Sequence, residues 1–227
     1  MQAALALCVM FVVAGSAAAA SAQPRLDPRV VEAIASYTGT AGRVDDAKAR
    51  ALIDAAATDG DVLARMWIAR AWSRGRLGYA RDEARARAIA DQMIGAVQRQ
   101  AALGVVEAQF LMGTAFDEGL GVAEDPTVAF GWFQKAAAAG HTLAEHNIGN
   151  AYAAGRGVPA DPAAAVTWWT RAALKGDAVP QLRLGEAYER GTGVAVDLAQ
   201  ARRWYADAAG RGNPAAKAAL ERLGSPR

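Results

Sequence analysis

The side chains that could bind a metal ion are few in this sequence. It contains two histidines, His141 and His146, which are five residues apart with Glu145 between them. A zinc site on one helix face needs ligands at i and i+4, and the single cysteine, Cys8, is far from both histidines in the sequence. We therefore predict no metal site, and we place His141 in a turn between two helices.

The residues around the serines and around the Gly-x-Gly turns also do not match motifs for nucleophilic catalysis or phosphate binding. The serines after residue 22 stand in neither a Gly-x-Ser-x-Gly nor a Ser-x-x-Lys motif, so nothing indicates an activated serine. Three Gly-x-Gly turns resemble phosphate loops, but a dinucleotide site needs its glycines between a strand and a helix. Here they follow a predicted helix each time, which indicates structural turns. We expect no enzymatic activity and no cofactor.

Composition points to a helical protein. The chain has 227 residues with 25 Lys plus Arg against 23 Asp plus Glu, and 53% of its residues are hydrophobic but only 7% aromatic. Much of the apolar share is alanine, a strong helix former, which argues against a large β-sandwich or barrel. The formal net charge of +2 argues against a dedicated nucleic-acid binder, so we expect no nucleic-acid partner.

The first 22 residues have the pattern of a secretory leader. Residues 3–20 form a nearly unbroken apolar run, followed by the small-x-small sequence Ala20-Ser21-Ala22. We predict that residues 1–22 are a cleaved signal peptide and that the protein is periplasmic or secreted. After cleavage, we do not expect it to be an integral membrane protein. No Lys or Arg precedes the run, and an uncleaved anchor helix is the alternative. A lipoprotein site at Cys8 is disfavoured because Leu7 is too bulky.

A shift of 36 residues superposes the second half of the chain on itself without a gap. The coinciding positions are Gly113, Gly149 and Gly185; Gly121, Gly157 and Gly193; Asp125, Asp161 and Asp197; Trp132, Trp168 and Trp204; and Gly140, Gly176 and Gly212. Residues 64–75 match residues 108–119 at a shift of 44, which predicts a second helix about two turns longer in that unit. Such self-similarity is the signature of a repeat architecture.

Each unit has the pattern of two antiparallel helices. In the best example, apolar residues recur at helical spacing from 144 to 155, and Gly155 ends that helix. Asp161 is a natural N-cap and Pro162 suits the first turn of the following helix. A single pair cannot bury its apolar face alone, so we predict an all-α fold, a right-handed α-solenoid of stacked antiparallel helix pairs, with Trp168 in the core between helices.

The repeated pattern resembles the Sel-1-like repeat family, a relative of the tetratricopeptide repeats. This resemblance implies degenerate N-terminal helical repeats over 23–107, three well-formed repeats over 108–213 and a C-terminal capping helix and tail over 214–227. It also implies an adaptor role in protein complexes, including bacterial envelope proteins. Some cysteine-braced secreted members bind or hydrolyse penicillins, but residues 23–227 contain no cysteine.

Two surface features suggest where a partner would bind. Residues 65–87 contain seven arginines against two acidic residues, which favours an anionic polymer or an acidic protein segment, with a solvated helix face as the alternative. On a helical wheel, the position of His146 points away from the buried face and is apolar in three of four units, which predicts an exposed strip with a polar rim. The predicted partner-binding residues are Met66, Arg70, Arg74, Phe110, Asp117, Glu118, His146, Asn150, Leu182, Glu186 and Arg190.

The leading hypothesis is a secreted or periplasmic helical-repeat adaptor that binds an envelope protein. The alternatives are a cell-wall or polysaccharide-binding accessory protein and, with less support, an enzyme acting on β-lactams or peptidoglycan. The Trp positions and the apolar strip are the expectations that a structure can test directly.

Overall fold

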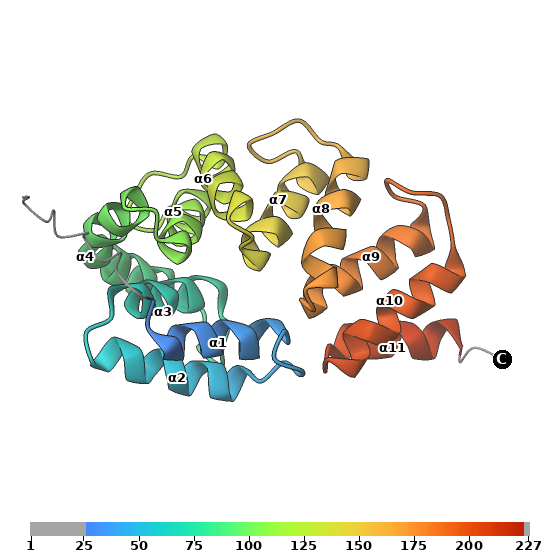
Figure 1. Cartoon of the computed structure of the whole chain (residues 1–227), viewed down its shortest axis with the longest axis horizontal. Coiled ribbons are helices and arrows are strands. Elements are labelled where there is room, and N and C mark those ends of the chain that lie inside the picture. The colour runs from blue at the N-terminus through green and yellow to red at the C-terminus, as the bar shows by residue number, and fades with distance from the viewer. Residues whose placement is uncertain (1–25, 225–227) are drawn as a thin grey trace, which may run out of the picture.

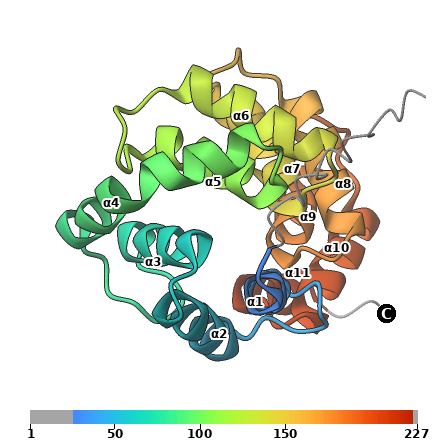
Figure 2. The same cartoon turned by 60° about the vertical axis from the view of Figure 1, so that its left-hand side comes forward.

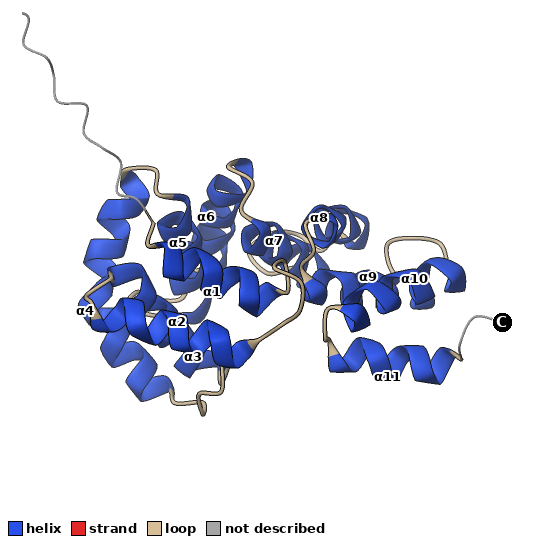
Figure 3. Cartoon of the chain, turned by 60° about the horizontal axis from the view of Figure 1, so that its bottom comes forward, coloured by secondary structure: helices blue, strands red, loops and turns tan. Residues whose placement is uncertain are grey.

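A computed structural model describes residues 26–224, and in this part of the chain it contains helices and no strand (Figures 1 and 3). The leader, Cys8 and Ser225 lie outside the described residues. No helix in the described part is both long and apolar enough to cross a bilayer. The helices are α1 (Pro28–Thr38), α2 (Asp46–Thr58), α3 (Val62–Arg74), α4 (Glu83–Ala102), α5 (Val106–Glu118), α6 (Pro126–Ala138), α7 (Thr142–Ala154), α8 (Pro162–Leu174), α9 (Ala178–Arg190), α10 (Leu198–Gly210) and α11 (Pro214–Leu223).

The helix boundaries follow from caps that the repeat places in every unit. In α8, the Asp161 carboxylate accepts hydrogen bonds from the backbone N–H groups of Ala163 and Ala164, and Pro162 occupies the first turn. Helix α7 ends at Gly155, whose φ of +65° is in the left-handed region that favours glycine. Corresponding residues cap the neighbouring units, so the 36-residue period in the sequence becomes a period of helix pairs. The predicted all-α solenoid is confirmed.

Within the pairs α5–α6, α7–α8 and α9–α10, a glycine of the first helix lies against an aromatic ring of the second. A Cβ atom on Gly149 would lie 2.4 Å from the Trp169 ring. Gly113 and Gly185 have the same relation to Phe133 and Tyr205. The repeated glycine therefore lets the two helices approach until the ring fills the space between them.

The prediction that Trp168 occupies the core is wrong. Trp169 is the buried residue, with 8% of its surface exposed, whereas Trp168 is half-buried on the flank of α8. One residue along a helix turns the side chain by about 100°, and that turn is the difference between facing Gly149 and facing the flank. The Arg171 guanidinium covers the Trp168 ring at 4.4 Å from its centroid.

Successive units are joined by the second glycine of each Gly-x-Gly turn. Gly157 has φ of +73°, and a Cβ there would lie 2.1 Å from the carbonyl oxygen of Pro126 in the preceding unit. Gly193 approaches the Pro162 carbonyl in the same way. No larger residue fits this approach without moving the backbone, so the glycines fix the stacking of one unit on the next.

The stack curves until its two ends meet (Figure 2). The loop between α1 and α2 contacts the turn between α10 and α11: the Val44 N–H donates to the Arg211 carbonyl at 2.8 Å, and the Arg211 guanidinium donates to the Gly39 carbonyl at 2.7 Å. We call this contact the seam. It closes the described part of the chain into a ring.

Candidate functional site

The ring encloses a central hollow of about 710 Å³. The first helix of every pair contributes to its wall, so that α1, α3, α5, α7 and α9 all line it. Residues of α2, α4 and α6, the turns between helices and the start of α11 complete the wall. The residues that line it on these helices include Tyr37, Arg70, Ser73, Arg74, Asp117, Glu118, His146, Asn147, Asn150, Arg183 and Pro214. A concave site built by every unit is the strongest candidate for ligand binding in this molecule.

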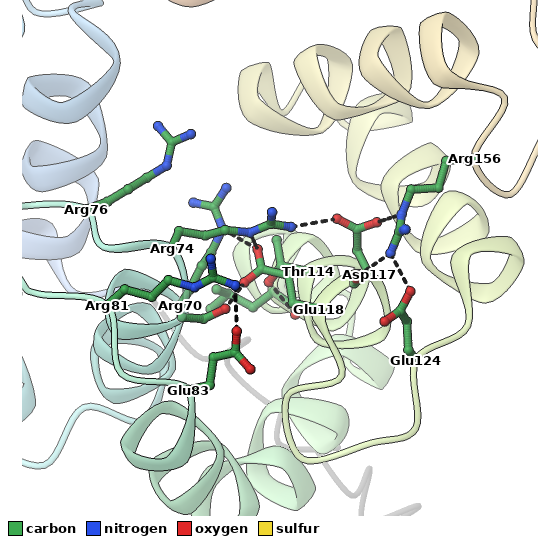
Figure 4. Close-up of polar contacts among 12 residues, drawn as sticks. Arg70, Arg74, Arg76, Arg81, Glu83, Thr114, Asp117, Glu118, Glu124 and Arg156 are labelled. Carbon is green, nitrogen blue, oxygen red and sulfur yellow. Dashed lines mark hydrogen bonds and ion pairs between the residues drawn. The ribbon is translucent and has the colours of Figure 1, made fainter.

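An ion-pair network crosses the wall of the hollow from α3 to the α7–α8 turn (Figure 4). Arg74 lies 2.9 Å from Glu118 and 3.4 Å from Asp117. Arg156, in the Gly-x-Gly turn after α7, lies 2.8 Å from Asp117 and 2.7 Å from Glu124. These pairs tie three units together, and they leave both signs of charge facing the hollow.

The electrostatics of the network follow from its hydrogen bonds. The bond that Arg156 donates to Asp117 is the main reason that the pKa of Arg156 is raised, with Glu124 adding to the effect. Glu118 is only 4% exposed and also accepts a hydrogen bond from the Ser73 hydroxyl at 2.7 Å. Its partner Arg74 is 47% exposed, so the arginine is the member of this pair that a ligand can reach.

Arg70 is less exposed than Arg74, although the sequence predicts both as partner-binding residues. The Arg70 side chain is 12% exposed, and its guanidinium lies 5.0 Å from the centroid of Trp67 and 5.3 Å from that of Phe110. Both arginines face the inside of the ring and line the hollow. The side of α3 that carries them faces the hollow because the first helices form the inner wall of the ring.

The expectation of an exposed apolar strip is wrong at two of its four positions. Met66 and Phe110 are fully buried, while His146 and Leu182 are partly exposed. Phe110 packs against Trp67 and stacks on His141, with centroids 5.7 Å and 4.5 Å away. The helical wheel considered one partner helix, but each first helix in the stack also packs against neighbouring units, which cover more of its circumference.

The structure brings together six of the predicted partner-binding residues in the hollow: Arg70, Arg74, Asp117, Glu118, His146 and Asn150. It does not bring Leu182, Glu186 or Arg190 there. Leu182 packs towards α10 and α11, and Glu186 pairs with Arg183 at 2.9 Å. No observation tests whether these residues bind a partner, so that role stays a prediction for those with exposed side chains.

Sequence reasoning missed several residues of the hollow. Arg156 was treated only as part of a turn, and Glu124 was not considered. The basic stretch did signal Arg76, Arg81 and Arg87, which line the hollow near the α3–α4 turn. Among them, Arg76 donates a hydrogen bond to the Tyr37 hydroxyl at 2.9 Å, whereas Arg81 and Arg87 both pair with Glu83.

Both histidines connect neighbouring units to buried carboxylates. His141 is the N-cap of α7: its Nδ1 accepts the Ala144 N–H at 3.2 Å, so the neutral ring carries its hydrogen on Nε2 and donates it to Glu107 at 2.9 Å. Glu107 also accepts the Trp67 indole N–H at 2.7 Å. The second histidine, His146, lies 3.3 Å from a carboxylate oxygen of Asp177.

These contacts give the histidines packing and capping roles. In residues 26–224, no three His, Cys, Asp or Glu side chains are grouped so that they could hold a metal ion.

The sequence profile of the Sel1 repeat matches four segments of the chain: residues 33–61, 106–141, 142–177 and 181–213. Together they cover more than half of its length. The chain belongs to the Sel1 repeat family. This helical-repeat fold is one that supports protein–protein interaction, which agrees with the concave wall described above. No curated protein matches the chain.

Two solved structures show the same Sel1 fold. A Sel1 repeat protein from Oxalobacter formigenes is 34% identical, with a TM-score of 0.55, and the match covers 79% of this chain and 50% of that one. The protective antigen c5321 of uropathogenic Escherichia coli is 24% identical, with a TM-score of 0.57 and coverage of 86% and 48%. This Sel1 chain therefore spans about half the length of each of these relatives.

Proposed function

We propose that this Sel1 repeat protein is an adaptor that binds an extended segment of a partner protein in the central hollow, in the periplasm or outside the cell. The observation that carries the proposal is the enclosure of one continuous hollow by the first helices of five successive units. Because every unit contributes to this surface, a bound partner would contact the protein along the whole length of the ring and not at a single unit.

The size and chemistry of the hollow support a segment of chain as the occupant. A volume of about 710 Å³ falls in the range of sites for small ligands and short peptides and is too small for a folded domain. The Asn147 side-chain amide can both donate and accept hydrogen bonds, as a peptide backbone requires. The network around Asp117 presents both signs of charge.

The rim near the α3–α4 turn gives the occupant a preferred charge. Arg74 is about half exposed, and Arg76, Arg81 and Arg87 lie on the same side of the hollow. We propose that acidic side chains of the partner pair with this rim, since arginine binds carboxylates through paired N–H donors. The same rim would suit an anionic cell-wall polymer, which is the second candidate.

The proposed location rests on the pattern of residues 1–22. An apolar run followed by Ala-Ser-Ala is the pattern of a leader removed during export. Mass spectrometry of the protein purified from the periplasm should give an N-terminus at Gln23, and a mature protein that retains Met1 would contradict this part of the proposal.

A pull-down from bacterial envelope extract tests the binding site. Ala151→Trp fills the hollow from the wall of α7, and Thr167→Trp adds the same side chain to the exposed face of α8 as the matched control. The unmodified protein and Thr167→Trp should both capture one stoichiometric protein that Ala151→Trp fails to capture, with similar circular dichroism for all three. Capture by Ala151→Trp at full yield would contradict the assignment to the hollow. Binding of purified muropeptides in place of a protein would favour the polymer.

A further inference from the structure

The second helices carry a tryptophan at the same register in three successive units, and in two of them a cation of the same helix covers the ring. The Lys135 ammonium lies 4.1 Å from the centroid of Trp132, and the Arg171 guanidinium lies 4.4 Å from that of Trp168. In both cases the cation follows the tryptophan by three residues, which places it one turn along the helix. The repeat thus builds an internal cation–π pair.

The third unit breaks this rule. Its tryptophan is Trp204 in α10, and the residue three positions later is Asp207, a carboxylate where the other units have a cation. Within residues 26–224, no Lys or Arg lies over the Trp204 ring, which is partly exposed. The third unit therefore has the same partly exposed aromatic ring, Trp204, but a negative side chain, Asp207, in place of the cation.

Trp204 and Asp207 lie in a groove between α8 and α10, to which Leu174, Gln200 and Gly42 also contribute. Leu174 is 75% exposed, so an apolar surface flanks the ring. Of the two arginines at the groove, Arg211 is held by its hydrogen bond to Gly39 at the seam. Arg203 is exposed and does not cover the ring.

We propose that this groove, the Trp204 site, binds an arginine side chain of a partner protein. A guanidinium stacks on an indole face, is weakly hydrated and can donate paired hydrogen bonds to a carboxylate such as Asp207, while its aliphatic stem packs on apolar surface such as Leu174. The partner supplies the cation that Lys135 and Arg171 supply internally in the preceding units.

The Trp204 site is separate from the adaptor function proposed for the hollow. The two sites share no lining residue, and α8 and α10, which supply most of the Trp204 site, contribute no residue to the wall of the hollow. A result at one site therefore leaves the proposal for the other unchanged.

Titration with N-acetyl-arginine N-methylamide, followed through the indole N–H signals in two-dimensional NMR spectra, tests the proposal. A Trp204→Phe variant assigns the Trp204 signal. The probe should shift this signal saturably and leave the Trp132 and Trp168 signals unchanged, because those rings are already covered. The neutral isostere N-acetyl-citrulline N-methylamide is the control for charge.

The decisive variant is Asp207→Arg, which recreates the arrangement of Trp168 and Arg171 in α10. It should weaken binding of the probe by about tenfold or more while leaving the melting temperature unchanged or raised, since the variant supplies the cation from within. The proposal is overturned if Asp207→Arg binds as well as the unmodified protein, if citrulline binds as well as arginine, or if all three indole signals shift together.

Discussion

Arg211 donates a hydrogen bond at 2.7 Å across the seam to the carbonyl oxygen of Gly39, which lies 172 residues earlier in the chain. The Arg211 carbonyl in turn accepts the Val44 N–H. A Cβ placed on Gly39 would lie 3.5 Å from the Arg211 Cβ. The two ends of the solenoid are therefore in direct contact through Gly39, Val44 and Arg211.

The seam predicts an engineered disulfide. Cβ atoms about 3.5 to 4.5 Å apart suit a disulfide, so Gly39→Cys with Arg211→Cys, in a Cys8→Ser background, should oxidise within the monomer. The oxidised monomer should migrate faster than the reduced one on a denaturing gel, because a cross-link between distant residues compacts the unfolded chain. The same background with Gly131→Cys and Arg211→Cys is the control and should stay reduced. Oxidation only to dimers would show that the seam is not formed in solution.

The packing of glycine against an aromatic ring predicts opposite effects for two glycine substitutions. Gly149→Ala should destabilise the fold by about 1 to 3 kcal/mol, because its Cβ meets the Trp169 ring. A Cβ at Gly131, in α6, would meet no atom within 4 Å. Gly131→Ala should therefore stabilise the fold by about 0.5 to 1 kcal/mol, because alanine has the higher helix propensity. Chemical unfolding measures both, and equal effects at the two positions would refute the packing argument.

The docking of α11 should weaken in acid. The bonds from Arg222 and from the Tyr205 hydroxyl lower the pKa of Glu189 to about 2. A carboxylate with a depressed folded-state pKa stabilises the fold fully above its unfolded pKa of about 4.3, and this contribution is lost as the pH falls towards 2. The protection factors of the α11 amides, which are exchange rates corrected for the intrinsic pH dependence, should therefore fall between pH 5 and pH 2 by more than they do in Glu189→Gln, which cannot titrate. Parallel pH profiles for the two proteins would disprove the role of Glu189.

Glu145 occupies a register at which other units donate a hydrogen bond to the preceding second helix. Side chains at the equivalent positions donate to the carbonyl oxygens of Ala57, Ala101 and Ala173: these donors are Arg65, Gln109 and Gln181. Glu145 is 1% exposed and instead pairs with Arg171 at 2.9 Å and Lys175 at 2.7 Å. In the α7–α8 unit, the hydrogen bond to the preceding helix is thus replaced by ion pairs between the buried Glu145 carboxylate and two cations.

This replacement predicts that the charge of Glu145 is dispensable but that its cations are not. Glu145→Gln should keep the free energy of unfolding within about 1 kcal/mol, because a neutral amide loses the ion pairs but avoids the cost of a buried charge. Arg171→Met with Lys175→Met should lose about 3 kcal/mol or more, because the carboxylate stays buried without a partner. Urea unfolding of the two variants gives the comparison, and a larger loss for Glu145→Gln would contradict it.

The sequence was sufficient for the helix pairs because their signals are local. Asp161, Pro162 and Gly155 lie within a few residues of the boundaries that they set, and the shift of 36 repeats them in register. Which of Trp168 and Trp169 is buried could not be predicted from neighbouring residues in the sequence. Both are aromatic, and only the position of Gly149 on the neighbouring helix decides which one is buried.

The hollow was only partly predictable for a related reason. Arg74, Asp117 and Asn150 were proposed because they lie opposite the buried face of their helices, and they do line the hollow. Phe110 was misplaced because its burial depends on His141 and Trp67 in neighbouring units. The contact of Arg211 with Gly39 depends on curvature accumulated over all the units, which no short stretch of sequence encodes.

The seam also changes how the molecule should unfold. In an open solenoid, the terminal units have one neighbour each and fray first, so that unfolding spreads inwards from the ends. Here the first unit has a neighbour on both sides, because Val44 and Gly39 bond to the turn before α11. Fraying must therefore begin by breaking this long-range contact. The array then has no free end, and its first and last units should unfold in a single cooperative transition.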